Sequence, residues 1–321
     1  MENYVFLAYL DILGFSAMVE KNEHNDLINI FYRIESCLFN TQKRFWKIDN
    51  NEAVRDLSKF NFNVIIISDS IIIHTNTTIQ ERLARKNRIL SILNVMEIEE
   101  DASLSTEMLN KILVDWEFKL YADQIKDFNS INDILNLLDK ENVDLQFRYL
   151  VKIIQQYIHE LLYNGHTVRG AVSFGELSYR KHLLRTNNQA NIIDNTMMVG
   201  KALVNAAKLE KRQDWAGCVI DKEVIKVVSP GVLNDQINCK ILCKYDVPLK
   251  KSEENDNLVL KECETESMYV IDWRFGNGNQ NPPSERLVSG AFEKHGKTIN
   301  NSVDSKRKNT LEFLNASKLQ S

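Results

Sequence analysis

The chain has 321 residues, a formal net charge of −4 and a sequence pI of about 6.0. This length predicts one large domain or two small ones, and the slight excess of acids argues against a direct, non-specific nucleic-acid partner. The five cysteines are odd in number and form no CxxC pair, which favours reduced thiols and a cytoplasmic location. No apolar run approaches the ~18 residues that span a bilayer, and the first residues lack a signal-peptide pattern, so we expect no membrane contact.

The first half of the chain predicts an apolar strand over residues 4–10 that ends at Asp11 and a glycine turn. A helix with one apolar face follows over about 27–38, because its apolar residues are spaced by three and four. Residues 62–74 predict a hairpin that bends at Ser68-Asp69-Ser70. The polar, charge-clustered residues 76–142 predict a helical insertion on the surface, with some disorder.

The second half predicts a helix near 150–161, a glycine-punctuated strand over 167–177 and, after a loop, a helix over about 201–211. Further strands are expected at 217–220, 241–245 and 268–273, and a polar tail over 306–321. The order of these elements predicts an α+β, ferredoxin-like core, with a central antiparallel sheet and packing helices. We therefore expect one domain over 1–221, with the insertion at 76–142, and a C-terminal extension over 222–321.

Two aspartates end neighbouring apolar segments, Asp11 after the first strand and Asp69 in the hairpin. A carboxylate in such surroundings has a high desolvation cost unless a cation compensates it. Carboxylate oxygens favour Mg²⁺ or Mn²⁺, so the pair predicts a shared cation site. Each aspartate also has a purely structural explanation, as a helix N-cap for Asp11 and as a turn residue for Asp69.

Four motifs in this order resemble the class III nucleotide cyclases: Asp11–Phe15, Ser68–Ser70, Arg169–Glu176 and Gly200–Glu210. The resemblance covers roughly a third of the chain. It implies a ferredoxin-like class III cyclase core, to which the helical insertion and the C-terminal extension are added, and makes residues 1–221 the catalytic domain.

The departures from the family pattern lie in the last of these motifs. Val204 and Lys208 stand where purine cyclases usually have an asparagine and an arginine, although Asn205 is one place along, and Lys201 stands near the usual acidic base-reading residue. In these respects the chain is more similar to the pyrimidine cyclases of the bacterial antiphage system called Pycsar. That similarity implies a homodimer that makes cyclic UMP or cyclic CMP, and a separate effector protein that senses the product. A lysine is only a donor and suits a carbonyl acceptor, which favours UTP slightly over CTP.

The resemblance also implies roles for the site residues. Asp11, Asp69 and the backbone of Ile12 would hold two Mg²⁺ or Mn²⁺ ions on the nucleoside triphosphate. The turn Ile12-Leu13-Gly14-Phe15-Ser16 would cradle the phosphates with backbone N–H groups. Arg169 and Lys208 are candidate catalytic cations, and Lys201 would contact the base.

Alternatives remain for the cations and for the whole chain. Arg169 is equally explained by an ion pair on a strand, and Lys201, Lys208 and the run 306–308 by solvated surface lysines and arginines. The histidines show no metal-ligand spacing. The chain as a whole is alternatively a catalytically inactive, nucleotide-binding regulatory module with a cyclase-like fold, or a divergent adenylate or guanylate cyclase.

Overall fold

The computed structural model describes residues 4–47, 62–75, 78–93, 103–114, 130–185, 192–250, 264–278, 281–297 and 299–316. The strands are β1 Tyr4–Ile12, β2 Asn63–Ile67, β3 Ser70–His74, β4 Val168–Glu176, β5 Ser178–Arg185, β6 Ile192–Val199, β7 Cys218–Ile220, β8 Leu242–Pro248 and β9 Thr265–Ile271. The helices are α1 Phe15–Lys21, α2 His24–Lys47, α3 Thr78–Leu93, α4 Thr106–Val114, α7 Ile131–Tyr163, α8 Lys201–Arg212, α9 Lys222–Val227, α10 Pro230–Asn238, α11 Glu285–Glu293 and α12 Asn301–Ala316, with the 3-10 turns η2 Trp273–Gly278 and η3 Lys294–Gly296.

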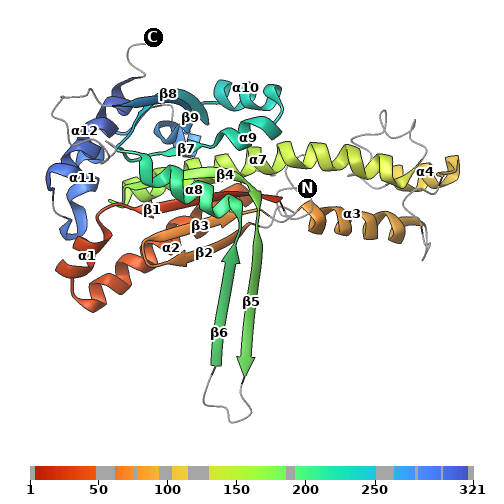
Figure 1. Cartoon of the computed structure of the whole chain (residues 1–321), viewed down its shortest axis with the longest axis horizontal. Helices are drawn as coiled ribbons and strands as arrows, with labels where there is room; N and C mark the ends of the chain where they lie inside the picture. Colours follow the sequence, from red (N-terminus) through yellow and green to blue (C-terminus); the bar gives the residue numbers. More distant parts are fainter. Residues whose placement is uncertain are drawn as a thin grey trace, which may run out of the picture.

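A seven-stranded mixed sheet forms the centre, in the order β2-β3-β1-β4-β7-β9-β8 (Figure 1). β1 pairs antiparallel with both β3 and β4, and β2 pairs antiparallel with β3. The order β4-β1-β3-β2 with antiparallel neighbours is that of a ferredoxin-like core, so the predicted α+β class and core are confirmed. β7 joins β4 in parallel, and β9 and β8 extend the sheet beyond it.

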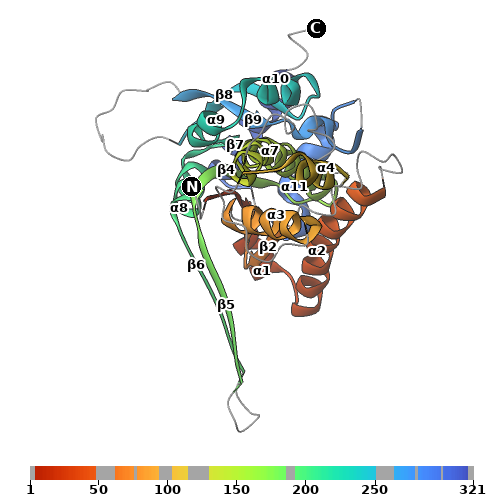
Figure 2. The ribbon, with the colours of Figure 1, turned by 90° about the vertical axis from the view of Figure 1, so that its right-hand side faces the viewer.

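The two faces of this sheet are covered by different helices (Figure 2). Even-numbered residues of β1 and β4 face α7, since Phe6 packs on Phe174 and on Phe147 of α7. Odd-numbered residues face α8, because Arg169 of β4 bonds to Glu210 of that helix. This alternation follows from the two-residue period of a strand.

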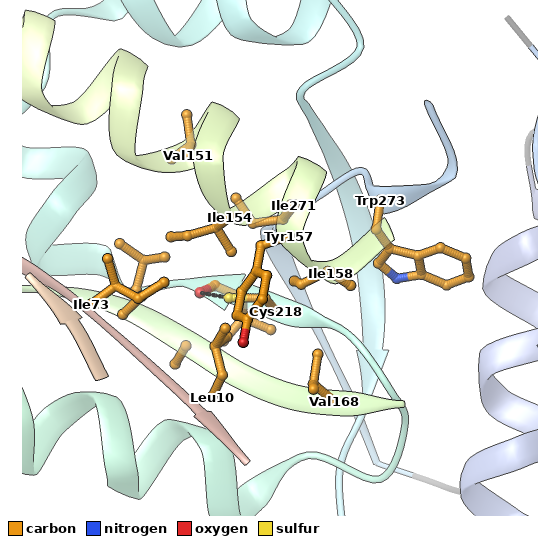
Figure 3. Close-up of a cluster of buried hydrophobic side chains, with 14 of the residues drawn as sticks. Leu10, Ile73, Val151, Ile154, Tyr157, Ile158, Val168, Cys218, Ile271 and Trp273 are labelled. Carbon is orange, nitrogen blue, oxygen red and sulfur yellow. Dashed lines mark hydrogen bonds between the residues drawn. The ribbon is translucent and has the colours of Figure 1, made fainter. Parts of the chain in front are cut away.

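The main core lies between α7 and the sheet (Figure 3). Leu10 of β1 and Val168 of β4 point toward Ile154, Tyr157 and Ile158 of α7. All five side chains are buried. The helix predicted near 150–161 is therefore confirmed as the element that covers this face.

The predicted helical insertion is confirmed in part. α3, α4 and the first turns of α7 pack a small core of their own, and the rest of 76–142 lies outside the described residues. α7 begins at Ile131, well before the predicted start, where Ser130 and Asp133 form a capping box. Its first turns were hidden in the sequence because their polar composition resembles that of the insertion.

Two sequence predictions are wrong, one for the segment after β4 and one for the C-terminal segment. The predicted loop before Met198 is the hairpin β5–β6, which extends away from the body of the molecule (Figure 1). The predicted polar tail is helical as far as Ala316, within α12, whose residues Lys306, Thr310, Phe313 and Leu314 are buried; residues 317–321 lie outside the described residues. Their spacing is that of one helical face, but a lysine and a threonine on that face conceal its amphipathic pattern.

The predicted boundary at residue 221 stays a prediction. β8 and β9, which follow it in the chain, extend the same sheet that holds β1 and β4. Among the helices that the structure describes, none combines the length and the apolar character needed to cross a membrane.

Candidate active site

The two aspartates lie together at one end of the central strands, as predicted. Asp11 pairs with Ser70, the first residue of β3, and Asp69 immediately precedes it in the turn. The carbonyl of Asp69 accepts a hydrogen bond from the N–H of Ile12 at 2.9 Å. The predicted hairpin bend is confirmed, and it brings Asp69 beside the end of β1.

Asp11 is partly buried and lies among both acidic and basic side chains. Burial is the largest cause that raises the pKa of Asp11 to about 6, and the carboxylates of Glu210 and Asp69 raise it further. Arg169 and Lys250 oppose this rise without cancelling it. A cation bound at Asp11 and Asp69 would relieve both the repulsion and part of the desolvation cost.

The donor set fits Mg²⁺ or Mn²⁺ bound together with a substrate. Within the described residues, no group of three or more histidine, cysteine or acidic side chains is arranged to hold a metal ion. Two carboxylates and the carbonyl of Ile12 leave the other coordination positions to water and phosphate oxygens. Mg²⁺ commonly binds in this way, with one or two carboxylates and substrate phosphates.

Arg169 lies next to Asp11 but is held mainly by α8. Its Nε donates to Glu210 Oε1 at 2.5 Å, and its Nη1 donates to the carbonyl of Gln213 at 3.1 Å. Its Nη2 also contacts Glu210 and lies 3.8 Å from Asp11 Oδ2. Arg169 is 7% exposed and Glu210 2%, so this is a buried ion pair that faces the aspartate.

Tyr9 and Ser70 lie beside this network on the same face of the sheet. Their hydroxyl oxygens are 2.7 Å apart, within hydrogen-bond distance. Burial raises the pKa of Tyr9, and the charges of Asp11, Glu210 and Asp69 act in the same direction, against the hydrogen bond with Ser70. The tyrosine hydroxyl is therefore kept neutral beside the carboxylates.

Lys208 and Lys201 lie on the outer side of α8, away from the Asp11 of their own chain. Lys208 precedes Glu210 by two residues, which is about 200° around the helix, and it is exposed. Lys201 is 78% exposed at the start of α8, 3.9 Å from Glu176, and about 14 Å along the helix axis from Glu210. Within one chain, the structure does not bring these two lysines to the carboxylates.

Two backbone N–H groups of the predicted phosphate turn already donate hydrogen bonds within the protein. The N–H of Ile12 bonds to Asp69, and that of Leu13 bonds to the carbonyl of Thr167 at 2.9 Å. Gly14 has a φ of 77°, a left-handed conformation that favours glycine. Beyond it, the ring of Phe15 packs against that of Phe31, and Ser16 is exposed. The part of the turn that can present backbone N–H groups to a phosphate therefore begins at Gly14.

Four charged residues near the site were given no site role from the sequence, namely Glu210, Lys250, Lys297 and Lys306. Lys306 was expected to be solvated, and it is buried. Lys306 lies 3.7 Å from Asp214, and Lys297 and Lys306 line a cavity of about 90 Å³ with Leu13 and Gly14. Glu210 lies in the motif Gly200–Glu210. It follows Ala202 by two helical turns and Ala206 by one, and this spacing could have placed it on the buried face of the helix. The lysines come from the C-terminal extension, and nothing local in the sequence connects them with residue 11.

Comparisons with known proteins give little further identification. No protein-family model matches the sequence, and no curated protein matches it. Among solved structures, the chain is similar to a "bacterial light-regulated adenylyl cyclase", with a TM-score of 0.32 and 10% identity over 88% of this chain and 94% of that one. A likeness this loose says nothing about activity, so the function has to be inferred from the residues of this chain.

Proposed function

We propose that the chain is a nucleotide cyclase that converts a pyrimidine nucleoside triphosphate into the 3′,5′-cyclic nucleotide and pyrophosphate. The observation that carries the proposal is the pair Asp11 and Asp69 at adjacent strand ends, where burial, followed by the carboxylates of Glu210 and Asp69, raises the pKa of Asp11 to about 6. The order of the four sequence motifs supports the same reaction.

The chemistry requires little covalent participation by the protein. The 3′ oxygen of the ribose forms a bond to the α-phosphorus, the bond from that phosphorus to the β-phosphate oxygen breaks, and the 3′ proton leaves to solvent. Bound Mg²⁺ or Mn²⁺ ions supply charge neutralisation and lower the pKa of the hydroxyl. Asp11, Asp69 and the Ile12 carbonyl hold the ions, and the backbone after Gly14 binds phosphate oxygens.

Arg169 acts on Asp11 in this proposal and not on the substrate. Its guanidinium is fixed by Glu210 and Gln213, and its remaining contact is the 3.8 Å approach to Asp11. It therefore orients the carboxylate and limits the repulsion at the site. The sequence-based role as a catalytic cation is better assigned to Lys208, if a second chain is present.

A homodimer would support that assignment, and an exposed apolar surface is the reason to propose one. The outer side of α8 and the base of β5–β6 expose large apolar side chains, namely Val204 at 48%, Val199 at 61%, Met197 at 58% and Tyr179 at 37%. Lys208 is one helical turn from Val204 on this surface. A second copy that covers these side chains in a two-fold arrangement would place Lys208 near the partner's carboxylates.

The base preference rests on Lys201 and on the resemblance to pyrimidine cyclases. A side chain that only donates suits the carbonyl oxygens of uracil and, less fully, of cytosine. We propose UTP as the first substrate and CTP as a close second. The product would serve as a second messenger in antiphage defence, read by a separate effector protein.

The test uses purified protein with Mn²⁺ and each of UTP, CTP, ATP and GTP, and identifies the products by mass. We expect cyclic UMP, then cyclic CMP, with little product from purines. Faster cyclisation of ATP or GTP would make the chain a divergent purine cyclase. Binding without turnover for all four would favour the inactive module, for which Val204 and Lys208 are the sequence evidence.

A further inference from the structure

We propose that Lys297, in the C-terminal extension, is a positioning residue that fixes the turn after Asp11. This inference rests on the proposed function, because it takes the Ile12 carbonyl as a metal ligand and the backbone after Gly14 as the phosphate cradle. The extension would then belong to the active-site architecture and would not be a separate appendage.

The side chain of Lys297 passes directly against the turn. A Cβ atom at Gly14 would lie 2.9 Å from Lys297 Cδ and 3.1 Å from Cγ, so the lysine methylenes fill the space behind this glycine. Its ammonium donates to the carbonyls of Gly165 and Ala291, each at 2.9 Å. One side chain thus ties the Gly14 turn, the end of α7 and the end of α11 together.

The same segment also holds the far end of α1. Asn22 Nδ2 donates to the carbonyl of Met18 at 2.7 Å and to that of His295 at 2.8 Å. The ring of His295 stacks on His166 with centroids 4.7 Å apart, and its Nε2 lies 3.0 Å from the carbonyl of Asn164. α1 is therefore clamped at both ends by residues 294–297, which are themselves anchored to the end of α7.

A lysine is a costly choice for this position. Lys297 is 7% exposed, and burial together with the charge of Lys294 lowers its pKa to about 8. An apolar side chain would fill the same space without burying an ammonium group. Only a long hydrogen-bond donor can also bond to both carbonyls, and these two bonds fix the position of the lysine side chain against Gly14.

The test variant is Lys297→Met, which keeps an unbranched chain of similar size and removes both carbonyl bonds. The matched control is Lys308→Met, which removes an exposed α12 lysine paired with Asp304 at 2.9 Å. The readouts are hydrogen exchange of the backbone amides of residues 13–21, binding of Mn²⁺ alone, and kcat and KM with Mn²⁺ and UTP.

We expect Lys297→Met to speed exchange in residues 13–21 and to weaken Mn²⁺ binding, each by about tenfold or more, because the loss of even one hydrogen bond to a charged group is worth a factor of about ten. Exchange in α9 and α10 should stay unchanged, and Lys308→Met should resemble the wild type. If Lys297→Met lowers the unfolding midpoint while exchange at 13–21 and Mn²⁺ binding stay normal, Lys297 contributes only to overall stability and the inference is wrong.

The inference can still be tested if the variant does not fold or if the wild type has no cyclase activity. If Lys297→Met does not fold, Asn22→Ala removes the other anchor of α1 and should produce the same local exchange and Mn²⁺ effects; normal values would contradict the clamp. If the wild type makes no cyclic nucleotide, the proposed function fails, but the exchange and Mn²⁺ measurements still decide whether Lys297 positions the turn.

Discussion

The two faces of the central strands have opposite chemistry. On the α7 face, Leu10 and Val168 pack into an apolar core (Figure 3). On the α8 face, one residue further along each strand, Asp11 and Arg169 meet Glu210 in a buried charged network. The alternation of a strand allows one segment to serve both purposes. The apolar face determines the fold, whereas the charged face has a desolvation cost that stability alone does not explain.

The largest difference between the faces should appear in activity. If the proposed metal site is correct, Asp11→Asn and Asp69→Asn each remove a metal-ligating charge and should lower turnover of UTP with Mn²⁺ by about a thousandfold or more, with the fold intact. Asp26→Asn, at an exposed position early in α2, is the matched control and should be unaffected. Near-normal turnover in either site variant, measured by product mass, would remove the metal assignment.

The outer side of α8 extends the comparison to a second chain, because in the proposed homodimer Lys208 acts on the partner's site. Asp11→Ala and Lys208→Ala homodimers should both be inactive. Mixing the two chains creates one site with an intact Asp11 and an intact Lys208, so isolated heterodimers should recover about half of the wild-type activity. Differently tagged chains allow the heterodimer to be purified and assayed. Heterodimers as inactive as their parents would contradict a shared site.

On the inner side of α8, removal of one charge should damage stability. Glu210→Gln leaves the buried guanidinium of Arg169 without its main partner and should lower the free energy of unfolding by about 4 kcal/mol. Glu266→Gln breaks an exposed ion pair with Arg212 of 3.0 Å and should cost less than about 1 kcal/mol. Urea unfolding of both variants measures the difference. Equal costs would mean that the buried pair is structurally dispensable.

The apolar face should respond to truncation in the ordinary way. Leu10→Ala leaves a cavity against α7 and should lower the free energy of unfolding by about 3 kcal/mol. Val19→Ala, at a side chain that is 40% exposed, should change it by less than about 0.5 kcal/mol. Mn²⁺ binding to folded Leu10→Ala should stay near normal, because Asp11 lies on the other face. A large loss of Mn²⁺ binding would show that the two faces are not independent.

The sequence predicted the parts of the site that are local and missed the parts that are assembled by tertiary contacts. Asp11 and Asp69 were visible because each interrupts an apolar strand, and the hairpin between β2 and β3 fixes where Asp69 lies. Lys250, Lys297 and Lys306 were not visible, because they follow Asp11 by more than two hundred residues and no local pattern marks them.

The errors in the fold have a related cause. β5 and α12 are rich in polar and charged residues, and the apolar residues of β6 come in adjacent runs and do not alternate, so hydrophobic periodicity gave no signal for these elements. The buried stripe of α12 includes Lys306 and Thr310, whose methylenes and methyl group pack while their polar atoms bond to nearby oxygens. Secondary structure that depends on such compensated polar burial can be identified only once its partners are in place.

The smallest expected effect is the pH dependence that Asp11 gives to stability. Its pKa is about 6 in the folded chain and 3.8 in the reference state, so between these values the native protein binds more protons than the unfolded one. Without metal, the stabilisation from protonated Asp11 is therefore lost as the pH rises through 6.

The variant Asp11→Asn tests this dependence. After allowance for solvent screening, its free energy of unfolding at pH 8 should exceed that of the wild type by about 1–2 kcal/mol, and the difference should be much smaller at pH 4. Urea unfolding in chelator at both pH values measures this difference. If Asp11 is a metal ligand as proposed, saturating Mn²⁺ should narrow or reverse the gain at pH 8, because the ion would bind strongly only to the wild-type carboxylate. An Asp11→Asn variant that is less stable than the wild type at pH 8 in chelator would show that the Asp11 carboxylate is stabilised by its neighbours without metal, and the raised pKa would be wrong.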